Sequence, residues 1–369
     1  MIPVNEPLFT GNEKKYLNQC IDQAWISSDG PFVGEFERKF SNYLGLKYGI
    51  AVCNGTAALE AALAAAGITG GDEVILPTFT IISCAIAIMR LGATPVLTDA
   101  EPETWNMDTA QIEPKITNKT KAIMVVHTYG HPVDMDPVME LAEKYGLKVI
   151  EDAAEVHGAE YKGKKAGSIG HVGCFSFYAN KIVTSGEGGM VVTDDEEIDR
   201  KARSYRNLCF LPEKRFYHTG LGYNFRMTNL QAAVGLAQLE QIDNHLRIKQ
   251  LMAAAYEKRL ADIENIKLPV QKEWARNVYW MYGIVLGDNS GMDNEALAAM
   301  LKEKGIATRP FFLGMHEQPV FQKMGMFRNE RYPVAERLAR KGLYLPSGLA
   351  LKEEQIETVC RALHKILKR

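Results

Sequence analysis

A lysine in an uncharged stretch between two apolar runs is the residue of this chain best suited to covalent chemistry. In the segment GCFSFYANKIVTSGEGGMV, Ser176 lies on an apolar run and Lys181 follows five residues later. Burial would disfavour the ammonium form and lower the pKa of this lysine, which makes the amine a nucleophile toward carbonyl groups. A lone lysine in a loop is more often a surface residue, so the neighbouring motifs must decide between the two interpretations.

Two further motifs could bind other parts of the same ligand. In KVIEDAAEVHGA, Asp152 directly follows a predicted buried strand, at the edge where open α/β sheets bind ligands. In AVCNGTAALEAAL, a strand, the residues Gly55 and Thr56 and a helix-forming run follow one another. The amides at such a helix start form an anion site. An anion site, a carboxylate and a hydroxyl–lysine pair together form the set that pyridoxal phosphate needs.

The bulk properties of the chain exclude several other classes of protein. The 369 residues carry a formal net charge of −2, which gives no electrostatic signature for binding nucleic acid or an anionic membrane. The six cysteines include no CxxC pair, so we expect reduced thiols and no metal site. The first predicted strand is followed by neither a Walker loop nor a GxGxxG motif, which disfavours a nicotinamide-dependent oxidoreductase. We expect a cytoplasmic protein without a secretory leader or membrane span.

The elements that must position these residues alternate between strand-like and helix-like runs. Short apolar runs predict strands at residues 49–52, 73–76, 94–97, 122–127, 148–150, 173–177 and 190–193. Runs rich in Ala, Leu, Met, Glu and Lys predict helices at 56–66, 82–91, 136–145 and 196–206. This alternation predicts a three-layer α/β domain with a mostly parallel sheet.

The pattern changes after Asn229. Leu239, Ile242 and Leu246 have helical spacing within a stretch of roughly thirty residues, long enough to bridge two domains. A β-like run at 278–286 and helix-like runs at 294–304 and 353–368 follow. We therefore predict a large domain at residues 1–245 and a smaller α+β domain at residues 246–369.

The motifs NGTAAL, GDEVILPTFT, VHTYG, EDAAE, FSFYANKIVTSGEGGMV and GYNFRMTN resemble those of the DegT/DnrJ/EryC1/StrS sugar aminotransferases, over nearly the full chain. The resemblance implies the type I aminotransferase fold, with an α/β/α large domain and a smaller C-terminal domain. It is strongest to the branch that aminates GDP-4-keto-6-deoxymannose at C4, with glutamate as donor, to give GDP-perosamine. It further implies a homodimer with shared active sites, and leaves a higher oligomer open.

The resemblance also assigns roles to individual residues. The implied catalytic residues are Lys181, which carries the cofactor, Asp152, which faces the pyridine nitrogen, and Glu155, which stands where many relatives have Gln. Ile81 replaces a usual aromatic residue against the cofactor ring and forfeits a stacking contribution of ~1 kcal/mol. The implied cofactor-binding residues are Gly55, Thr56, Ile81, Asp152, Glu155, Ser176, Lys181 and, in the neighbouring subunit, Asn224.

For the substrate, the resemblance points to residues that could equally serve packing or a dimer interface. Arg226 and Arg309 could hold sugar-linked phosphates, since guanidinium groups offer paired donors. His157 is expected to be structural. The candidate substrate residues are Trp25, Ser27, His127, Tyr129, Arg226, Arg309 and His316.

Several alternatives stay open at this point. The nucleotide could be UDP or dTDP, and the product could serve lipopolysaccharide O-antigen, an antibiotic or another glycan. A sugar dehydratase that uses the same cofactor is a competing activity, although relatives with that activity have a histidine where this chain has Lys181. A cofactor-binding regulator without turnover is a further alternative, disfavoured because no DNA-binding module or basic tail is visible.

Overall fold

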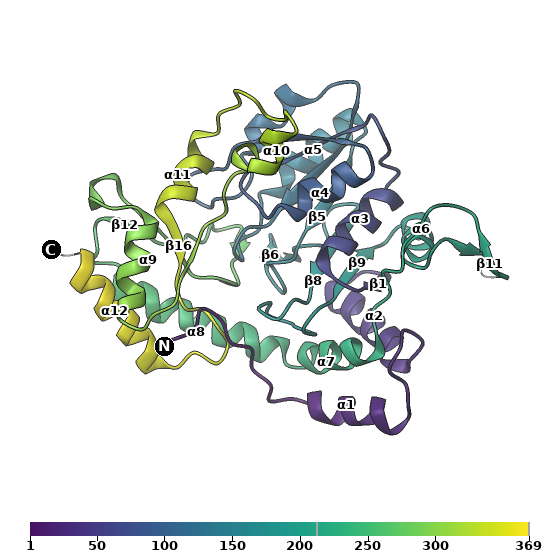
Figure 1. Ribbon diagram of the computed structural model, residues 1–369, viewed down its shortest axis with the longest axis horizontal. Coiled ribbons are helices and arrows are strands. Elements are labelled where there is room, and N and C mark those ends of the chain that lie inside the picture. Colours follow the sequence, from purple (N-terminus) through teal and green to yellow (C-terminus); the bar gives the residue numbers. More distant parts are fainter. Residues whose placement is uncertain (212, 368–369) are drawn as a thin grey trace.

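Seven strands form the central sheet of the computed structural model, which describes residues 1–211 and 213–367 (Figure 1). Their order is β1-β9-β8-β5-β4-β2-β3, and only β9 runs against the other six. Each of the seven predicted runs forms one strand, which confirms the mostly parallel sheet. The strands are β1 (Tyr48–Val52), β2 (Glu73–Pro77), β3 (Thr94–Thr98), β4 (Thr120–Val126), β5 (Lys148–Asp152), β8 (Val172–Ser176) and β9 (Gly189–Thr193).

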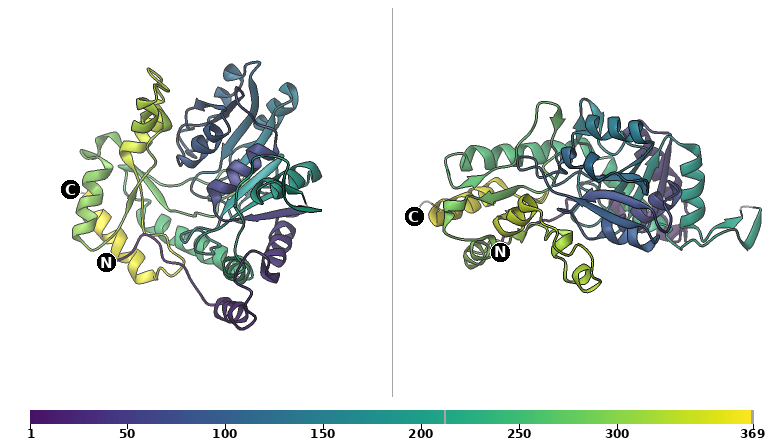
Figure 2. Two further views of the ribbon diagram at one scale, coloured as in Figure 1. Left: turned by 45° about the vertical axis from the view of Figure 1, so that its right-hand side comes forward. Right: turned by 90° about the horizontal axis from the view of Figure 1, so that it is seen from above.

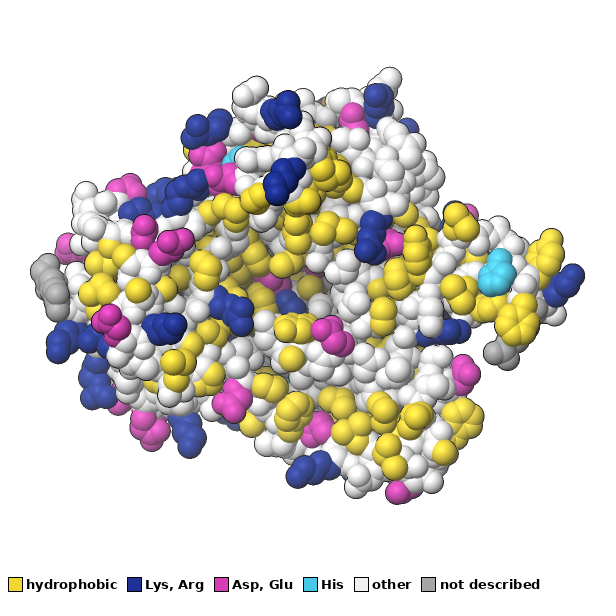
Figure 3. Space-filling view, viewed as in Figure 1, with side chains coloured by type: hydrophobic (Ala, Val, Ile, Leu, Met, Phe, Trp, Pro, Cys, Tyr) yellow, Lys and Arg dark blue, Asp and Glu magenta, His cyan; other side chains and the backbone are white. Residues whose placement is uncertain are grey.

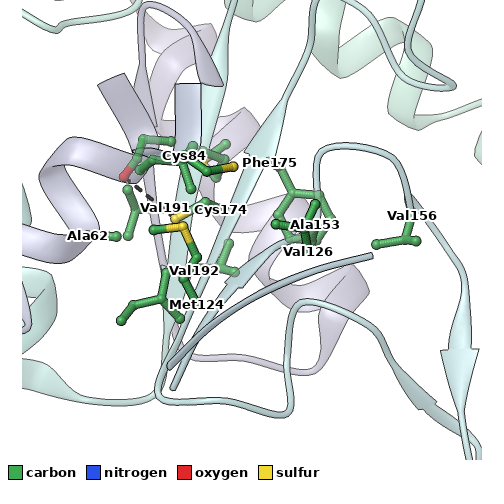
Figure 4. Close-up of a cluster of buried hydrophobic side chains, with 14 of the residues drawn as sticks. Ala62, Cys84, Met124, Val126, Ala153, Val156, Cys174, Phe175, Val191 and Val192 are labelled. Atoms are coloured by element: carbon green, nitrogen blue, oxygen red, sulfur yellow. Dashed lines mark hydrogen bonds between the residues drawn. The ribbon is translucent and has the colours of Figure 1, made fainter. Parts of the chain in front are cut away.

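The side chains of the sheet alternate between two hydrophobic layers, as successive residues of a strand must. In β4, Met124 and Val126 face a layer that includes residues of α2, α3 and α4, part of which Figure 4 shows. Ile123 and Val125 face the opposite layer, which includes residues of α5. The helices of this large part are α1 (Glu13–Asp22), α2 (Pro31–Leu44), α3 (Gly55–Ala65), α4 (Ser83–Arg90), α5 (Met135–Tyr145), α6 (Glu196–Arg206) and α7 (Asn229–Leu239).

A separate hydrophobic cluster lies in the C-terminal part of the chain, around a four-stranded sheet of order β12-β14-β16-β15. The N-terminus and the end of the last helix, at Leu367, lie at this part (Figure 1). Ile2 forms a bridge with Ile306, and the Ser347 amide donates to the Val4 carbonyl at 2.8 Å. The predicted domain boundary after residue 245 stays a prediction. The elements are α8 (Ile242–Leu260), β12 (Ile266–Lys267), β14 (Gly283–Leu286), α9 (Asn294–Glu303), β15 (Arg309–Pro310), α10 (Pro319–Lys323), α11 (Pro333–Lys341), β16 (Gly342–Tyr344) and α12 (Glu353–Leu367).

Short strands complete the fold outside the two main sheets. A hairpin of β10 (Phe210–Leu211) and β11 (Lys214–His218) projects from the body of the molecule (Figure 2). β6 (Glu160–Tyr161) pairs with both β7 (Lys164–Lys165) and β13 (Ala275–Arg276). In the described part of the chain, no helix is both long and apolar enough to cross a membrane.

Two predicted elements differ from the structure. The helical stretch after Asn229 is two helices, because the chain turns between α7 and α8, where the Gln241 amide bonds to the Gln238 carbonyl at 3.0 Å. The predicted strand at 278–286 begins only at Gly283, because Tyr279 has a φ of 47°, in the left-handed region that a strand cannot contain. The last predicted helical residue, Lys368, lies outside the described residues.

Candidate active site

A cavity of about 660 Å³ lies between the large part of the molecule and the C-terminal part, at the carboxyl ends of β1, β5 and β8. The space-filling view shows a hollow between these two parts of the molecule (Figure 3). Seven of the eight predicted cofactor residues line this cavity, all except Asn224. These seven are Gly55, Thr56, Ile81, Asp152, Glu155, Ser176 and Lys181.

The N-terminus of α3 forms one wall of the cavity. Asn54 caps this helix, since its side-chain oxygen accepts from the Ala57 amide at 2.8 Å. The first amides of a helix have no partner within it and attract anions. A Cβ on Gly55 would lie 2.8 Å from the Cβ of Ser176, so only glycine keeps the backbone this close to β8. The geometry suits a phosphate group bound by backbone amides.

Asp152 is held in place at the end of β5, where it is only 4% exposed. One carboxylate oxygen accepts from the Ala154 amide at 3.1 Å, and the other accepts from the Cys84 thiol at 3.1 Å. Burial and the neighbouring Asp152 carboxylate raise the pKa of the Cys84 thiol well above its usual value, so that the thiol stays protonated and donates. The carboxylate is therefore fixed before any ligand binds.

Lys181 reaches the same cavity from the turn after β8. Its side chain is 10% exposed, and its Nζ lies 3.8 Å from Glu155 Oε1 and 3.6 Å from the centre of the Trp280 ring. Burial lowers the pKa of Lys181, although the carboxylates of Glu155 and Asp152 oppose this shift. Loss of hydration is the larger effect, so a greater share of the amine is neutral and nucleophilic than in a surface lysine.

Glu155 is buried beside Lys181. Its other oxygen, Oε2, accepts from the Tyr129 amide at 2.7 Å. Burial raises the pKa of Glu155, and the charge of Lys181 works in the opposite direction. A carboxyl group with a raised pKa can hold a proton near neutral pH, which suits a group that shares a proton with a ligand or with Lys181.

The candidate substrate residues are not gathered in this cavity. Tyr129 supports Glu155 through its backbone, while its ring is buried among aromatic side chains. Trp25 and Ser27 lie in the connection between α1 and α2, where their carbonyls accept from Asn229. Arg309 is exposed and pairs in register with Tyr344.

Arg226 and Asn224 lie outside the cavity, on the segment that follows the hairpin. The Arg226 Nε donates to the Asn224 side-chain oxygen at 2.8 Å. A second guanidinium nitrogen of Arg226 donates to the side-chain oxygen of Asn207 at 2.7 Å. Asn224 itself is exposed, so its predicted role toward a neighbouring subunit stays a prediction.

Two histidines expected near the substrate instead hold the fold together. His127 is fully buried, with Nε2 3.0 Å from Glu151 Oε2 and Nδ1 2.9 Å from the Val133 amide. His316 is 4% exposed and bonds through Nδ1 to the Thr78 hydroxyl at 2.9 Å. A substrate contact is not supported for either residue, because both side chains are buried outside the cavity lining. His157, expected to be structural, is buried against Phe175.

We expect His127→Phe to lower the free energy of unfolding by about 3 kcal/mol, because it removes the imidazole donor from the buried Glu151 carboxylate and leaves the Val133 amide without its acceptor. The KM values for both substrates should stay close to those of the wild type, since His127 lies away from the cavity. Chemical denaturation monitored by circular dichroism, together with steady-state kinetics, checks both statements. A KM raised tenfold at unchanged stability would instead place His127 in substrate binding.

The C-terminal part supplies cavity residues that were not predicted. Trp280, Phe312 and Tyr344 face the cavity opposite the central sheet. Trp280 also donates from Nε1 to the Asn180 carbonyl at 2.8 Å, next to Lys181. The aromatic segment VYWMYG, which contains Trp280, was a usable signal for a cavity wall. The strand predicted there would have placed the Trp280 side chain differently.

The chain is similar to known proteins over nearly its whole length. The model of the DegT/DnrJ/EryC1/StrS aminotransferase family matches residues 8–364. The GDP-perosamine synthase of Caulobacter vibrioides is 44% identical over 99% of this chain and 98% of that protein. The GDP-perosamine synthase of Escherichia coli O157:H7 is 42% identical over 99% and 98%, respectively. The crystal structure of DesV from S. venezuelae is similar with a TM-score of 0.91 and 33% identity, over 97% of this chain and 95% of that one.

Proposed function

Since this chain belongs to the DegT/DnrJ/EryC1/StrS aminotransferase family and is a pyridoxal-phosphate-dependent sugar aminotransferase, we propose that it aminates GDP-4-keto-6-deoxymannose at C4 to give GDP-perosamine. The two GDP-perosamine synthases that match it over nearly their whole length support this choice of substrate. One structural observation carries the reaction type: the start of α3, Asp152 and the desolvated Lys181 meet in a single cavity. We further propose glutamate as the amino donor.

The residues of the cavity fit the cofactor by chemistry as well as by position. Gly55 and Thr56 would bind its phosphate through backbone amides, with the Ser176 hydroxyl beside them. The fixed carboxylate of Asp152 would hold a proton on the ring nitrogen, and Ile81 would pack on the ring face. Pyridoxal phosphate, when bound, supplies an electron-accepting ring that stabilises negative charge on the carbon attached to the transferred nitrogen.

Lys181 has two tasks in this proposal. Its neutral amine would bind the cofactor covalently with loss of water, and once released from that bond the same Nζ would remove a proton from the donor and return one to the acceptor. Glu155, 3.8 Å away, stabilises the ammonium form while Nζ holds the proton. The indole ring of Trp280 stabilises the same form from another side, through a cation–π contact. Lys181 is thus both the anchor and the proton carrier.

We also propose that the enzyme is a homodimer in which Asn224 reaches the cofactor phosphate of the neighbouring subunit. Apolar side chains on and after the hairpin support this proposal, since clustered exposed apolar residues mark protein interfaces. Tyr217 is 51% exposed, Leu221 94% and Tyr223 47%. The hydrophobic side chains of the projecting hairpin are visible in the space-filling view (Figure 3). We also propose that the enzyme is located in the cytoplasm and takes part in O-antigen synthesis.

A panel of nucleotide sugars tests the substrate. The purified protein is loaded with cofactor, supplied with glutamate and offered 4-keto-6-deoxy sugars linked to GDP, UDP or dTDP. We expect GDP-4-keto-6-deoxymannose to have the highest kcat/KM, by about tenfold or more, and to give GDP-perosamine by mass spectrometry and NMR. A preference for UDP or dTDP would refute the GDP assignment alone. A product that has lost a hydroxyl and gained no nitrogen would indicate the dehydratase.

A further inference from the structure

Lys249 is a buried cation that the proposed reaction does not use. It lies on α8, and its side chain is only 1% exposed. The ammonium group donates to the carbonyl of Trp280 at 2.8 Å and to the carbonyl of Ser347. Burial lowers the pKa of Lys249 to about 7, because no charged group of the described chain offsets the lost hydration. Burial of an ammonium group costs hydration free energy, so we expect Lys249 to have a role other than packing.

The first of its two partners is the residue that contacts Lys181. Trp280 lies between β13 and β14, outside any strand, directly after the left-handed Tyr279. Among the described residues, no backbone amide donates to its carbonyl, and Lys249 is the donor that does. On the other side, the Trp280 indole donates to the Asn180 carbonyl, and its ring face lies 3.6 Å from Lys181 Nζ. One residue thus joins Lys249 to the amine of the active site.

The second partner, Ser347, lies close in sequence to another cavity residue. Ser347 lies three residues after Tyr344, which lines the cavity. The Ser347 hydroxyl donates to the Leu345 carbonyl and accepts from the Tyr282 amide at 2.9 Å. Lys249 therefore joins the Trp280 segment to the segment that follows β16, and Trp280 and Tyr344, the last residue of β16, both line the cavity.

We propose that Lys249 is a positioning residue of the active site, which holds the Trp280 ring against Lys181 through the Trp280 carbonyl. The proposal rests on the function proposed for Lys181. Without the ammonium group, the Trp280 backbone has no donor at this point, and the indole can move away from Nζ. Lys181 then loses part of the stabilisation of its protonated form and its fixed position relative to the substrate.

The test compares three variants of the full-length, cofactor-loaded protein. Lys249→Met keeps the length of the side chain and removes its donors. Trp280→Leu leaves the backbone carbonyl in place and removes the aromatic ring. Lys258→Met is the matched control, the same change at an exposed position of α8. The readouts are the pH midpoint of the visible band of the bound cofactor, the cofactor Kd, and kcat and KM.

We expect Lys249→Met and Trp280→Leu to lower the pH midpoint of the band by about half a unit, because a cation–π contact is lost. We expect kcat to fall about tenfold in Lys249→Met at nearly unchanged KM. Lys258→Met should match the wild type. In the double variant Lys249→Met/Trp280→Leu, the effect on the midpoint should not exceed that of Trp280→Leu alone, because both changes remove the same contact.

A folded Lys249→Met with the midpoint and kcat of Lys258→Met would overturn the proposal. If Lys249→Met does not fold, Trp280→Leu decides: an unshifted midpoint overturns the proposal, and a lowered midpoint supports it. The variant Lys181→Ala tests the proposed function separately. If that variant kept the visible band, the role of Lys181 itself would be wrong, whatever Lys249→Met showed.

Discussion

Lys181→Ala is expected to lose the visible band of the bound cofactor and to lower kcat by about 10³-fold or more. The reason is that one amine both binds the cofactor covalently and carries the proton between donor and acceptor. No second lysine lines the cavity among the described residues, so none can take over. The cofactor should still bind through its phosphate, with a weaker Kd. Absorption spectra and single-turnover kinetics with glutamate measure these effects.

Lys164→Ala is a suitable control for this experiment. Lys164 is exposed on the short strand β7, outside the cavity lining, and the change removes the same charge. This variant should keep the band and the turnover of the wild type. Full activity in Lys181→Ala would show that the lysine was assigned wrongly.

Asp152→Asn is expected to lower kcat/KM by roughly 10²- to 10³-fold with little change in stability. The substitution keeps the shape of the side chain but removes the negative charge that would hold a proton on the cofactor ring. Because the charge is already buried and fixed by Ala154 and Cys84, its removal should not unfold the protein. Kinetics of the reaction with glutamate and a thermal melt of the same sample separate the two effects.

The adjacent carboxylate of β5 provides the opposite control. Glu151 faces the other side of the sheet, where it accepts from His127 and from the amides of Gly167 and Ile169. Glu151→Gln places a donor against amide donors, so we expect a loss of about 2 kcal/mol in stability with kcat nearly unchanged. If Asp152→Asn and Glu151→Gln affected only stability, Asp152 would have no role in catalysis.

Much of the large part of the molecule could be predicted from the sequence because its strands are buried on both faces. Continuous apolar runs locate such strands, and Asp152 and Ser176 then fall at strand ends without further information. The same alternation of side chains could have predicted that Glu151 and His127 do not face the cavity. It places Asp152 on one face of the sheet and its neighbour Glu151 on the other.

The rest of the site depends on contacts between distant segments. Trp280 reaches Lys181 only because Tyr279 turns the chain out of the expected strand, and no local periodicity indicates a left-handed residue there. Helix α2 was not predicted although its signal is local. Pro31 begins it, and Gly45, with a φ of 76°, ends it in the conformation typical of a helix C-terminus.

The proposed covalent bond between Lys181 and pyridoxal phosphate is tested most directly by peptide mapping. Sodium borohydride makes a bond between a lysine and this cofactor permanent, so the loaded wild-type protein is reduced, digested and analysed by mass spectrometry. We expect the cofactor mass on the peptide that contains Lys181 and its loss when glutamate is added before reduction. Cofactor found on another lysine, or on none, would contradict it.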